Sequence, residues 1–406
     1  MLSHRAGKAA SDLRRHNQAL VLDLVRTQGP VSRAQIARLG RLSMPAVMDI
    51  AGALIEEGLV REVGVGPSSG GRRPMLLDVV PEAFCALGVE VGTRTIRAVV
   101  TDLHAVVRHW TEVSSEMERG PAALQCQLSV LLRDMLHDAT RGFGGVLGVG
   151  LAVPAPILDS TALSFSPPSF PHWGELQLGD WLSTELKLPV LVENDAKAAA
   201  LGEFLYGAGR GVRNLFYLIV HRGVGGAAII NGELYRGADG GAGEIGHVAI
   251  ERDGPLCGCG QHGCLEALVG REAIRQRAIQ ALRQSGAAEL AGCPVDALGT
   301  DDIFDAALAG DPLARNILIE TGQFLGQGLA TVVNLFNPEL VILGGATMRA
   351  GPLILDPIAE VVQRRSMAGL AQHVRIVPGA LGQDAGAIGA AALVLRQLFA
   401  PAVELK

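Results

Sequence analysis

The segment GEIGHVAIERDGPLCGCGQHGCLE, residues 243–266, decides how this chain is interpreted. It places one histidine ahead of three closely spaced cysteines, and the four potential ligands are His247, Cys257, Cys259 and Cys264. Thiolate and imidazole donors in such a set are typical of closed, tetrahedral structural zinc sites. Gly258, Gly260 and Gly263 allow so short a loop to wrap around an ion. The segment therefore predicts a centre with Zn²⁺ as structural cofactor.

The cysteine distribution favours a metal over a disulfide. Half of the six cysteines fall within residues 257–264, whereas Cys85, Cys126 and Cys293 are scattered. A bridge between Cys257 and Cys259 would be strained, because a single residue separates them. The start of the chain does not resemble a secretory signal either. Redox chemistry or a chance cluster is the alternative to zinc.

Composition indicates a large protein with two to four domains, since the chain has 406 residues. It is 49% hydrophobic, yet no uncharged apolar run is long enough to span a bilayer. We therefore expect a soluble, cytoplasmic protein with no membrane partner. The low aromatic content, 4%, argues against a surface that stacks nucleic-acid bases.

Charge is distributed unevenly along the chain. Residues 1–80 contain 11 Lys+Arg against 7 Asp+Glu, a net charge of +4, and the remainder has 24 against 34, a net charge of −10. Together they give the overall charge of −6. A basic head on an acidic body predicts that only the head contacts phosphate.

The head has the pattern of three short helices. The first lies within residues 14–29 and ends at a Gly-Pro pair. A capping box of Ser32 and Gln35 starts the second helix, which stops at Gly40. The third starts at Ser43 and is expected to bury Val47, Ile50, Ala51, Leu54 and Ile55. Helix, tight turn and helix in this order predict a helix-turn-helix.

A β-prone segment, residues 59–79, follows these helices and predicts the hairpin of a winged helix. The residues expected to contact DNA are Arg33, Ser43, Met44, Ala46, Asp49, Arg72 and Arg73. The arginine pair suits the backbone or the minor groove, and the start of the third helix suits major-groove edges. Few bidentate base contacts are expected, because those helix side chains are small or apolar. The alternative is a small helical module that binds protein.

From residue 82 onward strands alternate with helices, which predicts an α/β body of about two lobes. Residues 84–103 read as two strands around a glycine turn, and residues 188–207 as a strand that leads into a helix. The expected domains are a winged helix-turn-helix over residues 1–80 and two lobes. The first lobe comprises residues 81–196 with the C-terminal helix 384–406, and the second comprises residues 197–383 with the zinc loop.

These motifs resemble the ROK family of sugar kinases and sugar-responsive transcriptional repressors. The resemblance is carried by an ExGH motif followed by CxCGxxGCxE, here Glu244, Gly246, His247, Cys257, Cys259, Gly260, Gly263, Cys264 and Glu266. It implies a two-lobed, actin-like ATPase fold for the body. A winged helix in front of that body is similar to the repressor branch, which is typified by xylose, glucose and N-acetylglucosamine regulators.

The resemblance also implies a sugar site. Its residues are Ser169, Asn194, Asp195, Glu244, His247 and Glu266, with Ser169 standing where family members carry an asparagine. In kinases of the family the residue matching Asp195 is the general base. Carboxylates suit this role, because they accept paired hydrogen bonds from hydroxyl groups. Without the resemblance, Asp195 could instead be the N-cap of the following helix.

Both glycine-rich phosphate loops of the kinases are altered here. The first, normally DxGGT, stands as residues 90–94 with sequence EVGTR, and the second, normally GTGxGGG, stands as residues 221–227 with sequence HRGVGGA. Phosphate loops need bare backbone close to the polyphosphate, so bulky side chains oppose ATP binding. We therefore expect no catalysis.

The sequence thus predicts a sugar-responsive DNA-binding regulator that represses carbohydrate genes. It is expected to bind double-stranded operator DNA as a homodimer or homotetramer. Its effector is expected to be a small sugar. Two alternatives stay open: a sugar kinase with an appended DNA-binding domain, and a regulator that answers to a protein partner.

Overall fold

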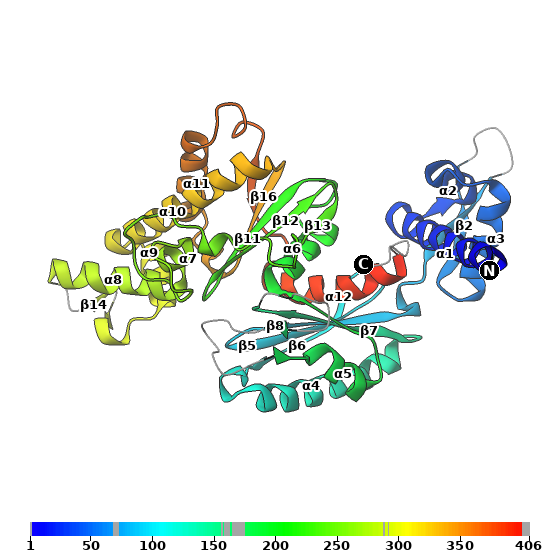
Figure 1. Cartoon of the computed structure of the whole chain (residues 1–406), viewed down its shortest axis with the longest axis horizontal. Coiled ribbons are helices and arrows are strands. Elements are labelled where there is room, and N and C mark those ends of the chain that lie inside the picture. The colour runs from blue at the N-terminus through cyan, green and yellow to red at the C-terminus, as the bar shows by residue number, and fades with distance from the viewer. Residues whose placement is uncertain are drawn as a thin grey trace.

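The computed structural model describes residues 2–67, 73–155, 157, 163–164, 175–286, 289–290 and 292–399; side chains are described from Leu13 onward, except in the segments 163–164 and 175–176. Two predicted binding residues, Arg72 and Ser169, lie outside the described residues. Figure 1 shows a small N-terminal body beside two α/β lobes, with helix α12 between them.

The N-terminal body contains helices α1 (Leu2–Gln28), α2 (Arg33–Gly40) and α3 (Met44–Glu56). An antiparallel sheet of order β1-β3-β2 accompanies them, built from β1 (Val31–Ser32), β2 (Val60–Val65) and β3 (Met75–Val79). The predicted capping box is confirmed, because the Ser32 hydroxyl accepts a hydrogen bond from the Gln35 backbone amide and the Gln35 side chain accepts one from Ser32. Helix α1 starts earlier than the sequence predicts.

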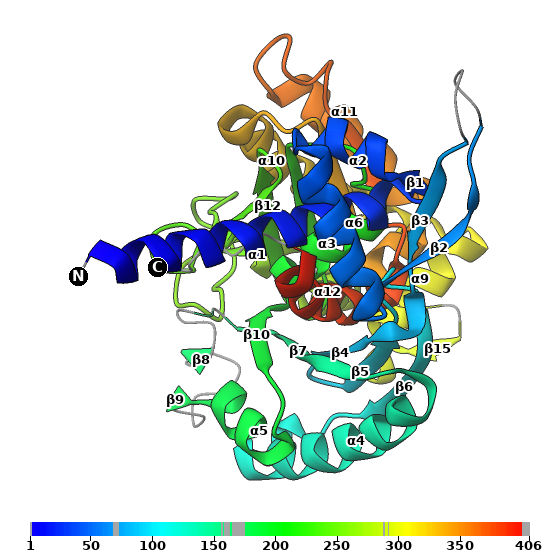
Figure 2. The same ribbon diagram turned by 90° about the vertical axis from the view of Figure 1, so that its right-hand side faces the viewer.

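The first lobe is built on a five-stranded sheet of order β10-β7-β4-β5-β6. Its strands are β4 (Cys85–Val91), β5 (Thr95–Thr101), β6 (Val107–Ser114), β7 (Val146–Val153) and β10 (Val190–Asn194). Helices α4 (Pro121–Gly142) and α5 (Leu178–Leu186) share an apolar core with one face of the sheet, and α12 (Ala385–Phe399) packs on β4 and β7. Figure 2 shows α4 and α5 below the sheet and α12 above it.

The second lobe has a five-stranded sheet of order β13-β12-β11-β16-β17. Its strands are β11 (Leu215–Val220), β12 (Val224–Ile230), β13 (Glu233–Tyr235), β16 (Leu340–Gly344) and β17 (Arg375–Pro378). The helices that form its main core are α7 (Leu265–Val269), α8 (Arg271–Ser285), α9 (Thr300–Ala309), α10 (Pro312–Phe336) and α11 (Pro352–Arg365). Helix α6 (Asp195–Tyr206) packs against β11 and β12 in a separate core.

The remaining described elements are short. The strands are β8 (Leu163–Ser164), β9 (Glu175–Leu176), β14 (Glu289–Leu290) and β15 (Cys293–Pro294). The 3₁₀ helices are η1 (Pro81–Ala83), η2 (Met117–Arg119), η3 (Ile245–His247), η4 (Val295–Ala297), η5 (Ala346–Ala350) and η6 (Gly382–Asp384). Among the helices of the described segments, none is long and apolar enough to cross a membrane.

The two large sheets share one topology. In each, the first three strands form an antiparallel meander; a fourth strand pairs in parallel with the first, and a fifth pairs in parallel with the fourth. Strand β4 therefore corresponds to β11, and the turn between β4 and β5 corresponds to the turn between β11 and β12. The two predicted phosphate loops lie at these equivalent turns, residues 90–94 and 221–227.

Helices α6 and α12 cross between the lobes in very close contact. A Cβ atom on Gly389 of α12 would lie 1.7 Å from the carbonyl oxygen of Ala198 on α6, and one on Gly202 would lie 2.8 Å from that of Ala385. Beneath the crossing, a Cβ on Gly88 of β4 would lie 1.9 Å from the Ala387 carbonyl oxygen. Only glycine fits at such positions, so the small residues of α12 set the distance between the lobes.

A buried carboxylate fastens the same helix pair. Glu203, on α6, is fully buried and accepts hydrogen bonds from the backbone amides of Ala208, Ala380 and Leu381 at 2.8–3.1 Å. Such amide donors compensate the carboxylate for the water that it loses on burial. The bonds tie α6 to the segment that leads into α12.

The N-terminal body packs directly on the end of α12. Val21 and Val25 of α1 belong to the same apolar core as Leu395 and Phe399. The guanidinium carbon of Arg26 lies 4.8 Å from the centre of the Phe399 ring and 5.9 Å from that of Tyr206, the last residue of α6. Helix α1 therefore contacts both helices that cross between the lobes.

We expect Gly389→Ala to lower the free energy of unfolding by about 1–3 kcal/mol, because the added methyl group overpacks the α6–α12 crossing. Gly142→Ala, at the end of α4, is the matched control, since nothing lies within 4 Å of the place that its added methyl group would take. Urea denaturation of the full chain measures both. Equal stability of Gly389→Ala and the parent would contradict the packing argument.

Candidate metal centre and ligand cleft

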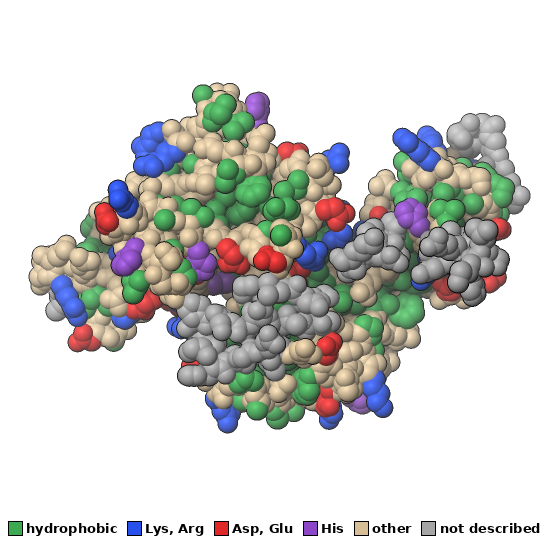
Figure 3. All heavy atoms as spheres, viewed as in Figure 1, with side chains coloured by type: hydrophobic (Ala, Val, Ile, Leu, Met, Phe, Trp, Pro, Cys, Tyr) green, Lys and Arg blue, Asp and Glu red, His purple; other side chains and the backbone are tan. Residues whose placement is uncertain are grey.

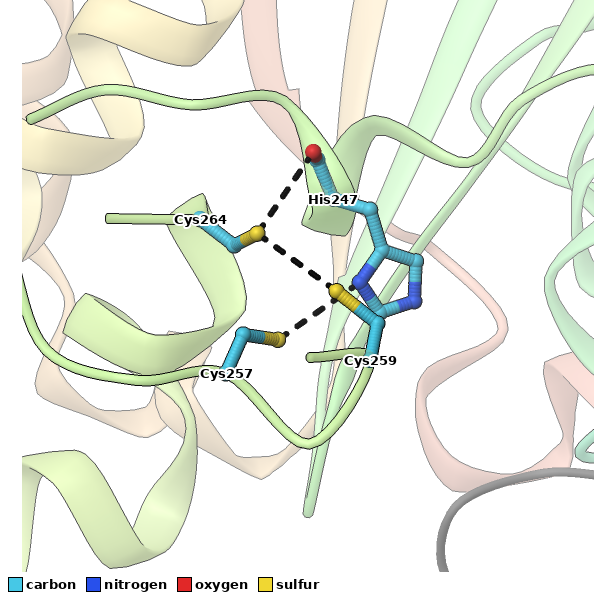
Figure 4. Close-up of side chains that lie close together, drawn as sticks. All are labelled: His247, Cys257, Cys259 and Cys264. Atoms are coloured by element: carbon cyan, nitrogen blue, oxygen red, sulfur yellow. Dashed lines mark hydrogen bonds between the residues drawn. The ribbon is translucent and has the colours of Figure 1, made fainter. Parts of the chain in front are cut away.

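The four predicted metal ligands converge at one point (Figure 4). The donor atoms of His247, Cys257, Cys259 and Cys264 all lie within 4.8 Å of one another. The Cys259 and Cys264 sulfur atoms are 3.7 Å apart, and Cys257 Sγ lies 3.7 Å from His247 Nδ1. Two thiolates bound tetrahedrally at about 2.3 Å from one ion are about 3.8 Å apart, so the arrangement fits a metal with this geometry.

Glycines shape the loop that presents these ligands. A turn bonds the Gly260 amide to the Cys257 carbonyl oxygen, and the Cys257 amide to the Gln261 carbonyl oxygen. Gly260 and Gly263 have φ angles of 89° and 69°, in the left-handed region that favours glycine. A Cβ atom on Gly263 would also lie 1.6 Å from the Glu251 carbonyl oxygen. A side chain at Gly263 would therefore displace the loop.

The thiols are held in contrasting surroundings. Burial raises the pKa of Cys257 to about 12 and raises that of Cys264, whereas hydrogen bonding, first of all from the Gln261 backbone, lowers the pKa of Cys259. Cys257 and Cys264 are only 3% and 0% exposed. A metal bound here must therefore displace protons from thiols that hold them strongly.

Glu266 connects the metal loop to the hairpin of the second phosphate loop. It lies in the first turn of α7, and its carboxylate accepts a hydrogen bond of 2.9 Å from the Val224 amide, while Cys257 Sγ lies 3.9 Å away. A Cβ atom on Gly223 would lie 2.2 Å from the same carboxylate oxygen. The glycine retained in this altered loop thus makes room for Glu266.

Asn194 and Asp195 lie where strand β10 ends and α6 begins. Asn194 is the N-cap of α6, because its side-chain oxygen accepts the Lys197 amide at 3.1 Å. The alternative that Asp195 is the cap is therefore wrong by one residue. Asp195 accepts hydrogen bonds from the Ala196 amide at 2.7 Å and the Asn194 amide group at 3.0 Å. Because its neighbour caps the helix, the half-buried Asp195 carboxylate is not used as the cap.

The charges of Asp195 and Glu244 interact where the two lobes meet. Burial raises the pKa of Asp195 to about 6; the charge of Glu244 also raises it, while the Ala196 amide lowers it. Glu244 occupies the N-cap position of helix η3, which ends at His247. The side chains of Glu244 and His247 are exposed. Figure 3 shows acidic and histidine side chains along the boundary between the two lobes. The predicted sugar residues that the structure describes thus come from both lobes.

Lys197 and Arg236 are two basic residues that sequence reasoning missed. They make polar contacts in and just before the glycine-rich segment of residues 237–247. Lys197 is 1% exposed and donates a hydrogen bond to the Gly240 carbonyl oxygen, and burial lowers its pKa. Arg236 forms an ion pair of 2.7 Å with Glu193, which is itself buried. A lysine within the apolar run of residues 196–201 was the available signal, because a buried lysine needs a partner.

The turn at the first phosphate loop is compact. The Gly92 amide bonds to the Thr95 carbonyl oxygen at 2.9 Å. Burial raises the pKa of Glu90 to about 8; the charge of Asp195 adds to this shift and that of Arg97 opposes it. A Cβ atom on Gly386 would lie 2.5 Å from the Glu90 carboxylate, so this acid packs against the start of α12.

The second phosphate loop forms an equally tight turn. The His221 amide bonds to the Gly223 carbonyl oxygen at 2.9 Å. Burial and the charge of Arg271 lower the pKa of His221, while the Arg222 side chain is exposed. Both altered loops are thus ordinary hairpin turns that carry larger side chains than a phosphate cradle.

Four of the predicted DNA-contacting residues lie in α3 or at its N-cap, and Arg72 lies outside the described residues. Ser43 is the N-cap of α3, and Met44 and Asp49 are exposed on the helix surface. Ala46 is half-buried, and Arg73 is exposed just before β3. Arg33 differs from the others, because its guanidinium forms an ion pair of 2.9 Å with Glu62 of β2.

Known proteins resemble this chain in sequence and in fold. Residues 86–397 match the ROK family. The chain is 31% identical to the xylose repressor of Bacillus spizizenii over 392 residues, which cover 94% of this chain and 96% of that protein. Its fold is similar to that of a ROK family transcriptional regulator described as a homologue of the Escherichia coli MLC protein, with a TM-score of 0.84, 26% identity and coverage of 96% and 97%.

A solved kinase matches only part of the chain. The ROK family glucokinase from Streptomyces griseus, in complex with glucose and AMPPNP, is 32% identical with a TM-score of 0.67, and the match covers 76% of this chain and 98% of the kinase. The fold thus defines a sugar-kinase-like α/β protein with an additional N-terminal helical region. The chain belongs to the ROK family.

The raised pKa of Glu90 has a measurable consequence. The native state binds this proton more tightly than the unfolded chain does, so stability should fall as pH rises from about 4.5 to about 8. Glu90→Gln should flatten that part of the pH profile, whereas Glu118→Gln, at an exposed position, should not. Urea denaturation at several pH values measures this. An unchanged profile for Glu90→Gln would place the pH dependence elsewhere.

Proposed function

We propose that this protein is a sugar-responsive transcriptional repressor whose α/β body binds the effector and whose N-terminal body binds operator DNA. The observation that carries this proposal is the extent of the similarity. The xylose repressor matches 94% of the chain, whereas the solved glucokinase matches 76% of it. The family match itself begins at residue 86, beyond the N-terminal body.

The N-terminal body supports a winged helix-turn-helix. Helix α2, the turn at Arg41 and helix α3 supply the helix-turn-helix, and the hairpin of β2 and β3 supplies the wing. We assign DNA contacts to Ser43, Met44, Ala46, Asp49, Arg72 and Arg73. Arg33 would share its guanidinium between phosphate and Glu62. Two such bodies on adjacent half-sites imply a homodimer or a homotetramer.

The effector site lies where the two lobes meet. We assign effector binding to Ser169, Asn194, Asp195, Glu244, His247 and Glu266. Three carboxylates and an amide are suited to the vicinal hydroxyls of a sugar. The zinc centre would hold His247 and the start of α7 in fixed positions, and so stiffen the part of the cleft that carries Glu266.

A route from effector to DNA runs through the two crossing helices. Asp195 begins α6, α6 packs on α12, and α12 packs on α1. A sugar that binds both lobes favours one lobe closure, and closure changes how α1 sits on the ends of α6 and α12. The effector then alters operator affinity through its different affinities for the two states.

A sugar kinase with an appended DNA-binding domain is the second candidate. The Asp195 carboxyl, with a pKa of about 6, is ionised enough at neutral pH to act as a base. The altered phosphate loops oppose this function. A coupled assay for ADP release across a sugar panel distinguishes the candidates, because a repressor without turnover releases none.

Zinc is the metal that we assign to the cysteine centre, by donor type and geometry. Purified protein should contain about one zinc per chain, and Cys257→Ser should lose it because a buried thiolate ligand is removed. Cys126→Ser, an exposed cysteine on α4, is the control and should retain the metal. Metal analysis by mass spectrometry measures both, and full zinc content in Cys257→Ser would refute the assignment.

Thermal unfolding against hexoses, pentoses and amino sugars, each with and without Mg-ATP, tests effector binding. One sugar should stabilise the protein by about 2.7 kcal/mol at a hundredfold excess over its Kd, and ATP should add nothing. Asp195→Asn should abolish the shift, whereas Asp134→Asn, on the exposed face of α4, should keep it. Stabilisation by ATP would favour the kinase, and regulation that is indifferent to Asp195→Asn would favour a protein partner.

A further inference from the structure

Helix α3 divides its side chains between the core of the N-terminal body and solvent. Its buried residues are Val47, Ile50, Ala51 and Leu54. Met44 and Met48, four residues apart, lie one turn from each other beside this buried face, where they are 45% and 51% exposed. Methionine adapts its shape to the surface that it contacts. Two of them on one exposed face indicate a contact surface.

Exposed arginines lie in the elements that flank α3 in the chain, where they could contact the phosphates of DNA. Arg38 near the end of α2, Arg41 in the turn before α3, Arg61 on β2 and Arg73 before β3 are all exposed. Helix α3 itself carries no basic residue. Phosphate contacts can therefore come from elements on either side of α3 in the chain, which leaves the helix surface for base edges.

The side chains of α3 restrict which bases the helix can recognise. Guanine is usually read by Arg or Lys and adenine by Asn or Gln, and the sequence MPAVMDIAGALIE contains none of these. The Ser43 oxygen caps the helix by accepting the Ala46 amide. Asp49 offers only acceptor atoms to a base. The apolar group that a major groove presents is the C5-methyl of thymine.

We propose that Met44 and Met48 read thymine methyl groups, so that A·T pairs occupy the part of each half-site beneath the start of α3. This inference rests on the proposed function as a DNA-binding regulator. The methionines supply apolar contact, and the surrounding arginines supply the affinity for phosphate. Specificity then depends on thymine methyl groups, which replacement of thymine by deoxyuridine removes.

The test starts with selection of duplexes from a random library by the full-length, zinc-loaded protein. The base pairs beneath α3 are those whose preference changes when the selection is repeated with Met44→Ala or Met48→Ala. Replacing thymine by deoxyuridine at these pairs deletes only the methyl group. Each replacement should weaken binding about fourfold, the effect of losing one buried methyl-sized group of about 0.8 kcal/mol.

The protein variants and the DNA replacements are combined in a double-mutant cycle. In Met48→Ala, thymine and deoxyuridine should bind equally at the pair that Met48 contacts, whereas Met367→Ala, an exposed methionine of the α/β body, should keep the fourfold difference. Selection of G·C pairs beneath α3, or equal binding of thymine and deoxyuridine by the parent, would overturn the inference and leave the proposed function intact. If no duplex is bound, the inference and the proposed DNA-binding function fail together, and the methionine face becomes a candidate protein-binding surface.

Discussion

The close crossing of α6 and α12 is the constraint on which the rest of the structure depends. A Cβ atom on Gly389 would overlap the backbone of Ala198, so the two helices touch backbone to backbone. Strand β10 leads directly into α6, and α12 ends against α1. The α6–α12 pair therefore joins the two lobes to each other and joins both lobes to the N-terminal body. A helix pair this tight transmits displacement, because it has no free space in which to absorb it.

Several charged side chains interact near this helix pair. The charge of Asp195 interacts with those of Glu90 and Glu244, and the Lys197 ammonium interacts with Asp195 and Glu244. Burial makes the carboxyls of Glu90 and Asp195 hold protons more tightly, which costs stability at neutral pH. Hydroxyl groups of a ligand can donate hydrogen bonds to such buried carboxylates in place of water. In the proposed function these residues would bind the sugar effector, and the altered loops would keep nucleotide out.

Much of the metal site could be predicted from local sequence. His247 and the three cysteines are close in the chain, and glycines restrict the loop, so few folded arrangements are available to them. The capping box of Ser32 and the strand-to-helix unit at Asn194 were predictable for the same reason. The alternative role of Asp195 as the cap is wrong by one residue, because Asn194 and Asp195 are both good caps and the choice depends on where β10 ends.

The sequence by itself determined the four candidate metal ligands, the helices of the N-terminal body and the order of strands and helices, because each depends on neighbours in the chain. The tertiary structure decided which distant groups meet. It buries Lys197 against the Gly240 carbonyl, brings Glu266 to the Val224 amide and places Arg26 on Phe399. Contacts between residues so far apart leave no periodic signal, since their geometry is fixed only when the sheets and helices pack around a common core.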